Sequence, residues 1–241
     1  MTRLEVIPVP GMPEIGRAAD LAGLLLDAVA AGHEQLRDHD IVVVTQKVVS
    51  KAEGAMAAVD PDDPLSHKPL VERESVRVLR RRGDLVISET RHGFICANAG
   101  IDLSNVARGE AALLPDDPDR SARRLRDAIA GRAGVRVGVI VSDTFGRPWR
   151  RGVTDVAIGS AGLRPVIDLR GTHDAYGREL QVTEVAVVDE IAGAADLVMG
   201  KAAGVPVAIV RGVALDAFLA PDERAGVLDR IVRSPGEDLF R

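Results

Sequence analysis

The sequence contains very few cysteine and aromatic residues. Its 241 residues include one cysteine, Cys96, together with one Trp, one Tyr and four Phe. A single cysteine excludes both an internal disulfide framework and a cysteine zinc cluster. Scarce aromatic residues also argue against binding of single-stranded nucleic acid, because the stacking platforms for bases are missing. The core must therefore consist of Val, Leu, Ile and Ala, as is typical of sheets covered by helices.

Long apolar runs and an excess of positive charge are missing as well. No segment approaches the ~20 apolar residues that span a bilayer, and the first residues do not resemble a signal peptide. The formal net charge is −5, from 31 basic and 36 acidic residues, which argues against a nucleic-acid partner. We therefore expect a cytoplasmic protein with neither a membrane nor a nucleic acid as its partner. A chain of this length buries roughly 70% of its unfolded surface, so it needs no disulfide or metal to fold.

Apolar periodicities predict strands and helices in alternation along the chain. Strands are expected at residues 4–9, 40–45, 84–88, 135–141 and 206–210. Helices are expected at residues 21–29, 71–79, 118–129 and 183–199. No linker or shift in composition divides the chain, so we predict a single domain over residues 1–241. Its fold class is α/β or mixed α+β, with mixed β-sheets and covering helices.

The usual phosphate-binding motifs are absent, since the sequence has neither a G-x-x-x-x-G-K-[ST] loop nor a G-x-G-x-x-G after a strand. The best local candidate for a ligand site is Asp143 with Thr144, directly after the strand expected at residues 135–141. Ligands of open α/β sheets lie beyond the carboxyl ends of strands. Both side chains offer hard oxygens suited to Mg²⁺ or Mn²⁺. The alternative is an ordinary turn at the end of the strand, where Asp and Thr satisfy backbone groups.

Two further polar segments are candidate ligand sites. Residues 98–105 combine small residues, which let a backbone approach a ligand closely, with oxygens from Asp102 and Asn105. An Asx-rich turn before a helix is the alternative there. Residues 146–152 contain three arginines, whose forks suit phosphate and carboxylate groups. The alternative for this segment is a solvated basic loop.

Single residues elsewhere carry weaker signals. Lys51, in a short turn-like segment after the strand at residues 40–45, is either a point charge for phosphates or an ordinary surface lysine. His92 is expected to be structural, and Cys96, in an apolar run, is expected to fill the core rather than act as a nucleophile. Residues 115–119 are acidic and contain prolines, which predicts a solvated connection.

Five segments occur in an order that resembles one family, the coenzyme F420-0:L-glutamate ligases, which are gamma-glutamyl ligases of deazaflavin coenzyme biosynthesis. The segments are residues 10–13 (PGMP), 48–54 (VVSKAEG), 92–102 (HGFICANAGID), 142–150 (SDTFGRPWR) and 198–201 (VMGK). The resemblance runs from about residue 6 to about residue 213, nearly the whole chain. Its two long segments are specific to the family.

The resemblance implies a GTP-dependent ligase that adds L-glutamate to the lactyl carboxylate of coenzyme F420-0 through an acyl-phosphate. It also implies two divalent cations, Mg²⁺ or Mn²⁺, with K⁺ as a helper, and an intertwined homodimer. Some bacterial relatives carry a nitroreductase-like domain after the ligase, and we expect none here after Arg241. Two alternatives remain: a related ligase that acts on another small carboxylate, and a GTP-binding protein without catalysis.

The resemblance also assigns individual residues to the site. Asp102 and Asp143 are implied as catalytic carboxylates and metal ligands, with Thr144 on the second cation. The implied GTP contacts are Met12, Pro13, Glu14, Ile15, Gln46, Lys51 and Asn105. Gln46 departs from the family pattern, because this position is frequently a small hydroxyl residue.

Overall fold

Helices and strands alternate in a mixed α/β arrangement in the computed structural model, which describes residues 3–214, 217–219, 224–234 and 236–238. The first half contains β1 (Glu5–Pro8), α1 (Leu21–Ala31), β2 (Ile41–Thr45), α2 (Gln46–Glu53), β3 (Met56–Ala58), α3 (Lys68–Glu74), β4 (Ser75–Arg82), β5 (Leu85–Thr90), β6 (Ile95–Ala97) and the 3₁₀ turn η1 (Asn98–Gly100). The second half contains β7 (Glu110–Ala112), α4 (Pro118–Ala133), β8 (Gly138–Arg147), β9 (Arg150–Ala161), β10 (Ile167–Asp168), β11 (Glu184–Val185), α5 (Val187–Met199), β12 (Val207–Arg211) and α6 (Val227–Arg230). The fold class predicted from the sequence is confirmed.

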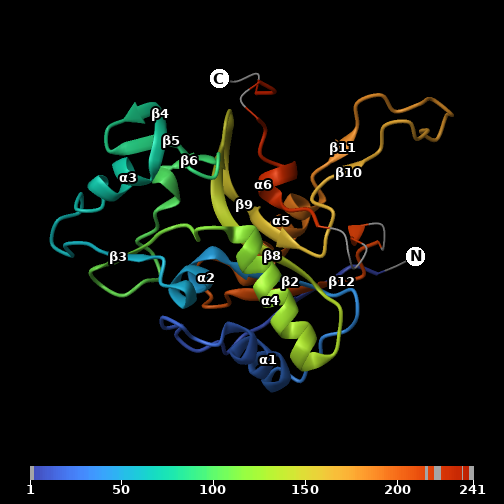
Figure 1. The fold of residues 1–241 in the computed structure, drawn as a ribbon, viewed down its shortest axis with the longest axis horizontal. Coiled ribbons are helices and arrows are strands. Elements are labelled where there is room, and N and C mark those ends of the chain that lie inside the picture. Colours follow the sequence, from blue (N-terminus) through green and yellow to red (C-terminus); the bar gives the residue numbers. More distant parts are fainter. Residues whose placement is uncertain (1–2, 215–216, 220–223, 235, 239–241) are drawn as a thin grey trace.

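A five-stranded sheet in the order β1-β12-β2-β8-β9 forms the centre of the molecule (Figure 1). Only β2 and β8 run parallel; the other neighbours are antiparallel. On one face, α4 packs on β8 and β9 and also contacts α1, whereas α5 packs on β1, β9 and β12 on the other face. Among the described residues, no helix combines the length and apolar composition needed to cross a membrane.

The middle strands of this sheet are buried on both faces. Ile41, Val42, Val43 and Val44 are fully buried in β2, which explains why their stretch of sequence is a continuous apolar run. The start of α4 lies directly on β9: a Cβ atom added to Gly159 would come within 2.3 Å of the Pro118 carbonyl. A larger residue at this glycine would therefore push the helix off the sheet.

Between β2 and β8 the chain makes a long excursion outside the main sheet. It contains α2, a small sheet of β3 and β7, and a three-stranded sheet in the order β4-β5-β6 that projects to one side (Figure 1). After β6 the chain reverses through η1, where Asn98, Ala99 and Gly100 all have positive φ angles of 48°, 54° and 71°. The Asn98 Oδ1 atom accepts hydrogen bonds from Lys68 Nζ and from the Val86 backbone N–H, both at 3.2 Å. This tight left-handed turn directs residues 101–105 back toward the main sheet.

Several boundaries differ from those expected. The helix expected at residues 71–79 was wrong in its second half, because α3 ends at Glu74 and β4 begins at Ser75 to pair with β5. The helix expected from residue 183 begins only at Val187, after the short strand β11. Strand β9 was not anticipated at all. Residues 46–53, which include the segment read as turn-like, form helix α2.

Candidate functional site

A cavity of about 620 Å³ opens where β2 ends beside the middle of β8. The two strands are parallel, and Thr45, the last residue of β2, lies beside Ser142 in β8, which continues past this edge to Arg147. The walls also include residues 12–15 before α1, residues 105–107 of the excursion and the segment between α5 and β12. The position follows the general rule that ligands of α/β sheets bind beyond the carboxyl ends of strands.

Nearly all residues implied by the family resemblance meet at this cavity. Its lining includes Met12, Pro13, Glu14, Ile15, Gln46, Lys51, Asn105, Asp143 and Thr144. Asp102 lies beside it and is joined by an ion pair to Lys47, which is itself a lining residue. The structure thus brings together side chains that are far apart in sequence, while their roles in binding stay predictions.

Asp143 lies within β8, not in a turn after it, because the strand continues to Arg147. Burial raises the pKa of the Asp143 carboxyl to about 7, and the charges of Asp102 and Asp155 add to this rise. A hydrogen bond from the Thr144 backbone N–H, 2.8 Å from Asp143 Oδ1, and the charge of Lys47 act in the opposite direction. A partly buried carboxylate beside other carboxylates gains most from a nearby cation.

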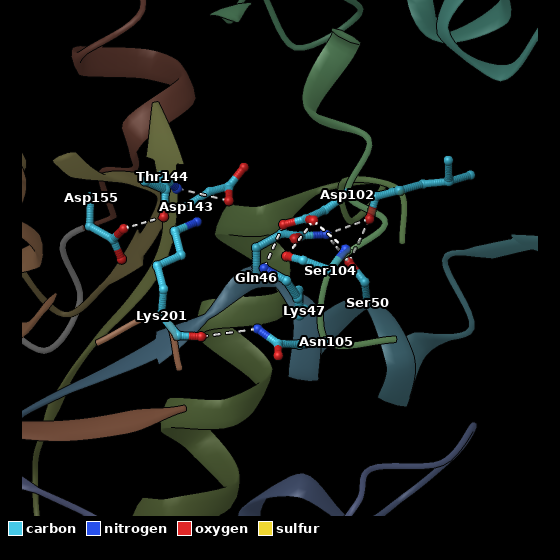
Figure 2. A network of polar contacts seen from close by, with 11 residues as sticks. Gln46, Lys47, Ser50, Asp102, Ser104, Asn105, Asp143, Thr144, Asp155 and Lys201 are labelled. Atoms are coloured by element: carbon cyan, nitrogen blue, oxygen red, sulfur yellow. Dashed lines mark hydrogen bonds and ion pairs between the residues drawn. The ribbon is translucent and has the colours of Figure 1, made fainter. Parts of the chain in front are cut away.

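Asp102 reaches the same place from the excursion. Its backbone pairs with Ala112 in an isolated bridge, which fixes the segment after η1. Asp102 Oδ1 accepts hydrogen bonds from the backbone N–H and the hydroxyl of Ser104, at 2.8 and 2.7 Å, and Oδ2 lies 2.5 Å from Lys47 Nζ (Figure 2). Burial acts to raise the pKa of Asp102, but the bonds from Lys47 and Ser104 outweigh it and lower the pKa. Asp102 is therefore held as a carboxylate.

Asp155 is a cavity residue that the sequence analysis missed. It lies on β9 directly opposite Thr144, and its buried carboxylate accepts a hydrogen bond from Thr144 Oγ1 at 2.6 Å (Figure 2). The other carboxylate oxygen accepts a hydrogen bond from Ser142 Oγ at 2.9 Å. The signal in the sequence was one acidic residue before the apolar run Val156, Ala157 and Ile158. It could be interpreted only once β9 was known to pair with β8.

Three lysines supply positive charge at the cavity: Lys47, Lys51 and Lys201. Lys51 Nζ lies 2.5 Å from Glu14 Oε1, and only 11% of the Lys51 side chain is exposed. Lys51 is therefore not an ordinary surface lysine. Lys201 extends toward Thr144 in Figure 2, and its carbonyl accepts a hydrogen bond from Asn105 Nδ2 at 3.2 Å.

Gln46 is buried at the start of α2. Its Nε2 group donates hydrogen bonds to Ser50 Oγ at 2.7 Å and to the Leu113 carbonyl at 2.6 Å (Figure 2). Its Oε1 atom is buried without a hydrogen-bond partner among the described residues. The side chain thus ties α2 to the segment after β7, and its contact with a nucleotide stays a prediction.

The arginine-rich segment lies apart from the cavity. Residues 146–152 form the tip of the β8–β9 hairpin, where Arg147, Arg150 and Arg151 are exposed and Trp149 is 85% exposed. None of these residues lines the cavity. The arginine-rich segment therefore follows Asp143 along the chain, as expected, but its arginine side chains do not line the cavity that contains Asp143.

Cys96 and His92 fit the structural roles expected of them. Cys96 is buried in β6, where burial and, to a lesser degree, the charge of Asp143 raise the pKa of its thiol to about 12. His92 Nε2 lies 3.1 Å from the Asp116 carbonyl, and its ring stacks on Phe94 with 5.7 Å between centroids. Burial lowers the pKa of His92, so neutral imidazole is favoured.

The oxygens around Asp102 and Asp143 fit a hard divalent cation. Nowhere in the described part of the chain do three His, Cys, Asp or Glu side chains converge as metal ligands. Magnesium, however, is commonly held by one or two carboxylates together with water and substrate phosphates. Lys47 Nζ already occupies a cation position on Asp102, which shows that the carboxylate accepts positive charge there.

Comparisons with known proteins identify the family of the chain. A sequence model of the F420-0:Gamma-glutamyl ligase family matches residues 11–212. A protein named coenzyme F420:L-glutamate ligase from Methanothermobacter thermautotrophicus is 46% identical, over 87% of this chain and 89% of its own. Proteins of the same name from Methanopyrus kandleri and Archaeoglobus fulgidus are 42% and 39% identical, each over 99% of this chain and over 98% and 97% of their own. The resemblance found in the sequence is confirmed, and the chain belongs to the F420-0:Gamma-glutamyl ligase family.

Proposed function

We propose that the protein is a GTP-dependent ligase that joins L-glutamate to the lactyl carboxylate of coenzyme F420-0. The names of its relatives support coenzyme F420 and L-glutamate as the substrates. The observation that carries the proposal is the convergence of Asp102 and Asp143 with three lysines on one cavity of about 620 Å³. Such a cavity has room for a nucleotide, and its charges suit polyphosphate with a divalent cation.

The chemistry requires two steps, because the oxygen of a free carboxylate is not displaced by an amine. In the first step a carboxylate oxygen attacks the γ-phosphorus of GTP, the bond to GDP breaks, and an acyl-phosphate forms. In the second step the glutamate amine attacks the acyl carbon and inorganic phosphate leaves with the bonding electrons. The amine loses a proton, and an amide remains.

Residues of this chain would position the reactants. Lys51 and Lys201 attract phosphate oxygens as point charges, while residues 12–15 and Asn105 hold the nucleotide against the end of the sheet. Asp102, Asp143 and Thr144 would hold the divalent cation, Mg²⁺ or Mn²⁺, which when bound neutralises charge on the attacking and leaving oxygens. The partly enclosed cavity limits the access of water to the acyl-phosphate.

Further parts of the proposal rest on the family resemblance. We include an intertwined homodimer, two divalent cations for each site, K⁺ as a helper and a cytoplasmic location. A related ligase acting on another small carboxylate is the second candidate, since the cavity residues that suit GTP and a cation do not specify the acid.

One experiment tests the proposal. The purified protein is incubated with coenzyme F420-0, L-glutamate, Mn²⁺ and either GTP or ATP, and the products are identified by mass spectrometry. We expect a glutamyl amide of coenzyme F420-0 together with GDP and phosphate, and loss of all three products in Asp143→Asn. Asp127→Asn, on the exposed side of α4, is the matched control and should keep full activity. GTP binding without turnover would support a non-catalytic protein instead.

A further inference from the structure

Lys47 is the cavity lysine that the proposed reaction leaves without a role. Its Nζ lies 2.5 Å from Asp102 Oδ2, and only 14% of its side chain is exposed. Asp102 Oδ1 is already occupied, because Ser104 donates two hydrogen bonds to it (Figure 2). Lys47 therefore holds the one oxygen of Asp102 that Ser104 leaves open.

The charge of Lys47 acts on both carboxylates implied as metal ligands. Burial acts to raise the pKa of Asp102, and the hydrogen bond from Lys47 is the largest of the opposing effects. Burial also raises the pKa of Asp143, and the charge of Lys47 lowers it. Lys47 thus lies where a divalent cation would act on the same two groups.

Helix stability does not explain a lysine at this position. Lys47 is in the first turn of α2 (Gln46–Glu53), where the positive end of the helix dipole disfavours a cation. Lys51, in the last turn of the same helix, has the favourable position and pairs with Glu14 rather than with a carboxylate implied in metal binding. The placement of Lys47 is therefore better explained by Asp102 than by its own helix.

We propose that Lys47 is a resident counter-cation of the metal site, which a divalent cation displaces from Asp102 when it binds. The inference rests on the proposed function, because it assumes that Asp102 is a metal ligand. An ammonium group and a divalent cation repel each other strongly at contact distance in a partly buried site. The flexible stem of Lys47 lets the freed ammonium turn into the cavity, where it meets an anionic co-substrate.

This exchange has two consequences. Before the cation binds, Lys47 offsets the repulsion among Asp102, Asp143 and Asp155, so the empty site keeps its geometry. After the cation binds, one more positive charge becomes available to phosphate oxygens. The protein should therefore bind the cation first and the nucleotide second.

The exchange is tested by measuring the affinity for Mn²⁺ in the absence of nucleotide. Calorimetry is carried out on Lys47→Met, Lys51→Met and the unaltered protein. Lys47→Met removes the competing cation, so we expect Mn²⁺ binding to tighten on the order of tenfold. Lys51→Met is the matched control one helical turn away and should change Mn²⁺ affinity by less than about twofold. With Mn²⁺ saturating, GTP binding to Lys47→Met should weaken. Unchanged or weaker Mn²⁺ binding by folded Lys47→Met overturns the inference.

A second measurement uses the unaltered protein and does not depend on the variant folding. Lysines are acetylated briefly with acetic anhydride, with and without Mn²⁺, and labelling is read by mass spectrometry of peptides. Labelling of Lys47 should increase when Mn²⁺ is present, while labelling of Lys51 stays constant. Constant or decreased labelling of Lys47 contradicts the exchange. If labelling of Lys47 does not increase although the protein binds Mn²⁺ and Asp102→Asn weakens that binding, only the exchange is wrong and the proposed function stands. If the protein binds no Mn²⁺, both proposals fail.

Discussion

Thr144 donates its hydroxyl hydrogen to Asp155 across the β8–β9 pair, with 2.6 Å between Thr144 Oγ1 and Asp155 Oδ1. Because the hydrogen is committed to Asp155, the lone pairs of Thr144 Oγ1 remain available on the cavity side. The second oxygen of Asp155 is fixed by Ser142, so the carboxylate cannot easily rotate. Asp155 is thus a positioning residue for Thr144.

Asp155→Asn should weaken cation binding without unfolding the protein. The amide replaces one accepting oxygen by a donor, so either Thr144 or Ser142 must turn its hydrogen away. Loss of such an outer partner typically costs about 10- to 100-fold in metal affinity or activity. We expect the Mn²⁺ concentration for half-maximal activity to rise in that range. Ser142→Ala, which keeps the Thr144–Asp155 bond, should have a much smaller effect, and equal effects of the two variants would contradict the assignment.

Lys51→Met should impair the use of GTP. Its side chain is largely buried beside Glu14 at the cavity, where the lost charge is poorly replaced by solvent. We expect kcat/KM for GTP to fall by about tenfold or more, with the KM for glutamate almost unchanged. Steady-state kinetics that vary the two substrates separately make the distinction. An unaltered GTP dependence would remove Lys51 from the nucleotide site.

Cys96 should resist alkylation in the folded protein. Burial raises the pKa of its thiol to about 12, so at pH 8 only about one molecule in ten thousand carries the reactive thiolate. Incubation with iodoacetamide should leave both the mass and the activity unchanged. Cys96→Ser places a hydroxyl in the apolar site and should lower the free energy of unfolding by about 1–3 kcal/mol, with kcat retained. A folded but inactive Cys96→Ser variant would show a catalytic role instead.

Asp119 anchors the C-terminal segment, since its carboxylate accepts hydrogen bonds from the backbone N–H groups of Ser160, Val227 and Leu228. Asp119→Ala leaves these buried donors unsatisfied and should destabilise the fold by about 2–4 kcal/mol, measured by urea denaturation. Burial raises the pKa of Asp119, so the folded state holds its proton more tightly than the unfolded state does. The stability contributed by this group is therefore present at low pH and lost as the pH rises through the folded pKa.

The pH dependence can be isolated by comparison with Asp119→Asn, which does not titrate. As the pH rises from the usual pKa of an aspartate through the raised pKa of Asp119, the free energy of unfolding of the unaltered protein should fall relative to that of the variant. If the unaltered protein instead gains stability relative to Asp119→Asn as the pH rises, the hydrogen bonds outweigh burial and lower the pKa of this carboxyl.

The elements predicted correctly from the sequence are those with a strong apolar periodicity of their own. Strand β2 and helix α1 have continuous or evenly spaced apolar residues, and both were located to within a few residues. Strand β9 begins with Arg150, Arg151 and Gly152, which carry no strand signal, and its position is set by pairing with β8. In β4, likewise, pairing with β5 decides between a strand and the helical spacing of the same residues. Local patterns do not contain such long-range pairings.

The residues of the candidate site, likewise, were predicted where a local motif marks them and missed where only their spatial neighbours do. Motifs of the sequence singled out Asp102, Asp143, Thr144, Lys51 and Asn105, and the structure places all of them at or beside one cavity. Lys47 and Asp155 were not singled out, because their importance depends on what lies opposite them in space. Asp119 was assigned to a solvated loop, yet its carboxylate is buried and accepts hydrogen bonds from three backbone N–H groups that are distant in sequence.

Because β2 pairs directly with β8, the geometry of the main sheet does not depend on the length of the excursion that connects these two strands. Ile41 pairs with Gly138 and Thr45 with Ser142, so the register is independent of how many residues connect the two strands. After its outer sheets the excursion returns to the cavity through the segment that follows η1, where Asp102 and residues 105–107 lie. Over evolution, insertions and deletions should therefore accumulate in its outer turns, near residues 60–64 and 83–84, while the chain length from Asn98 to Asn105 stays constant.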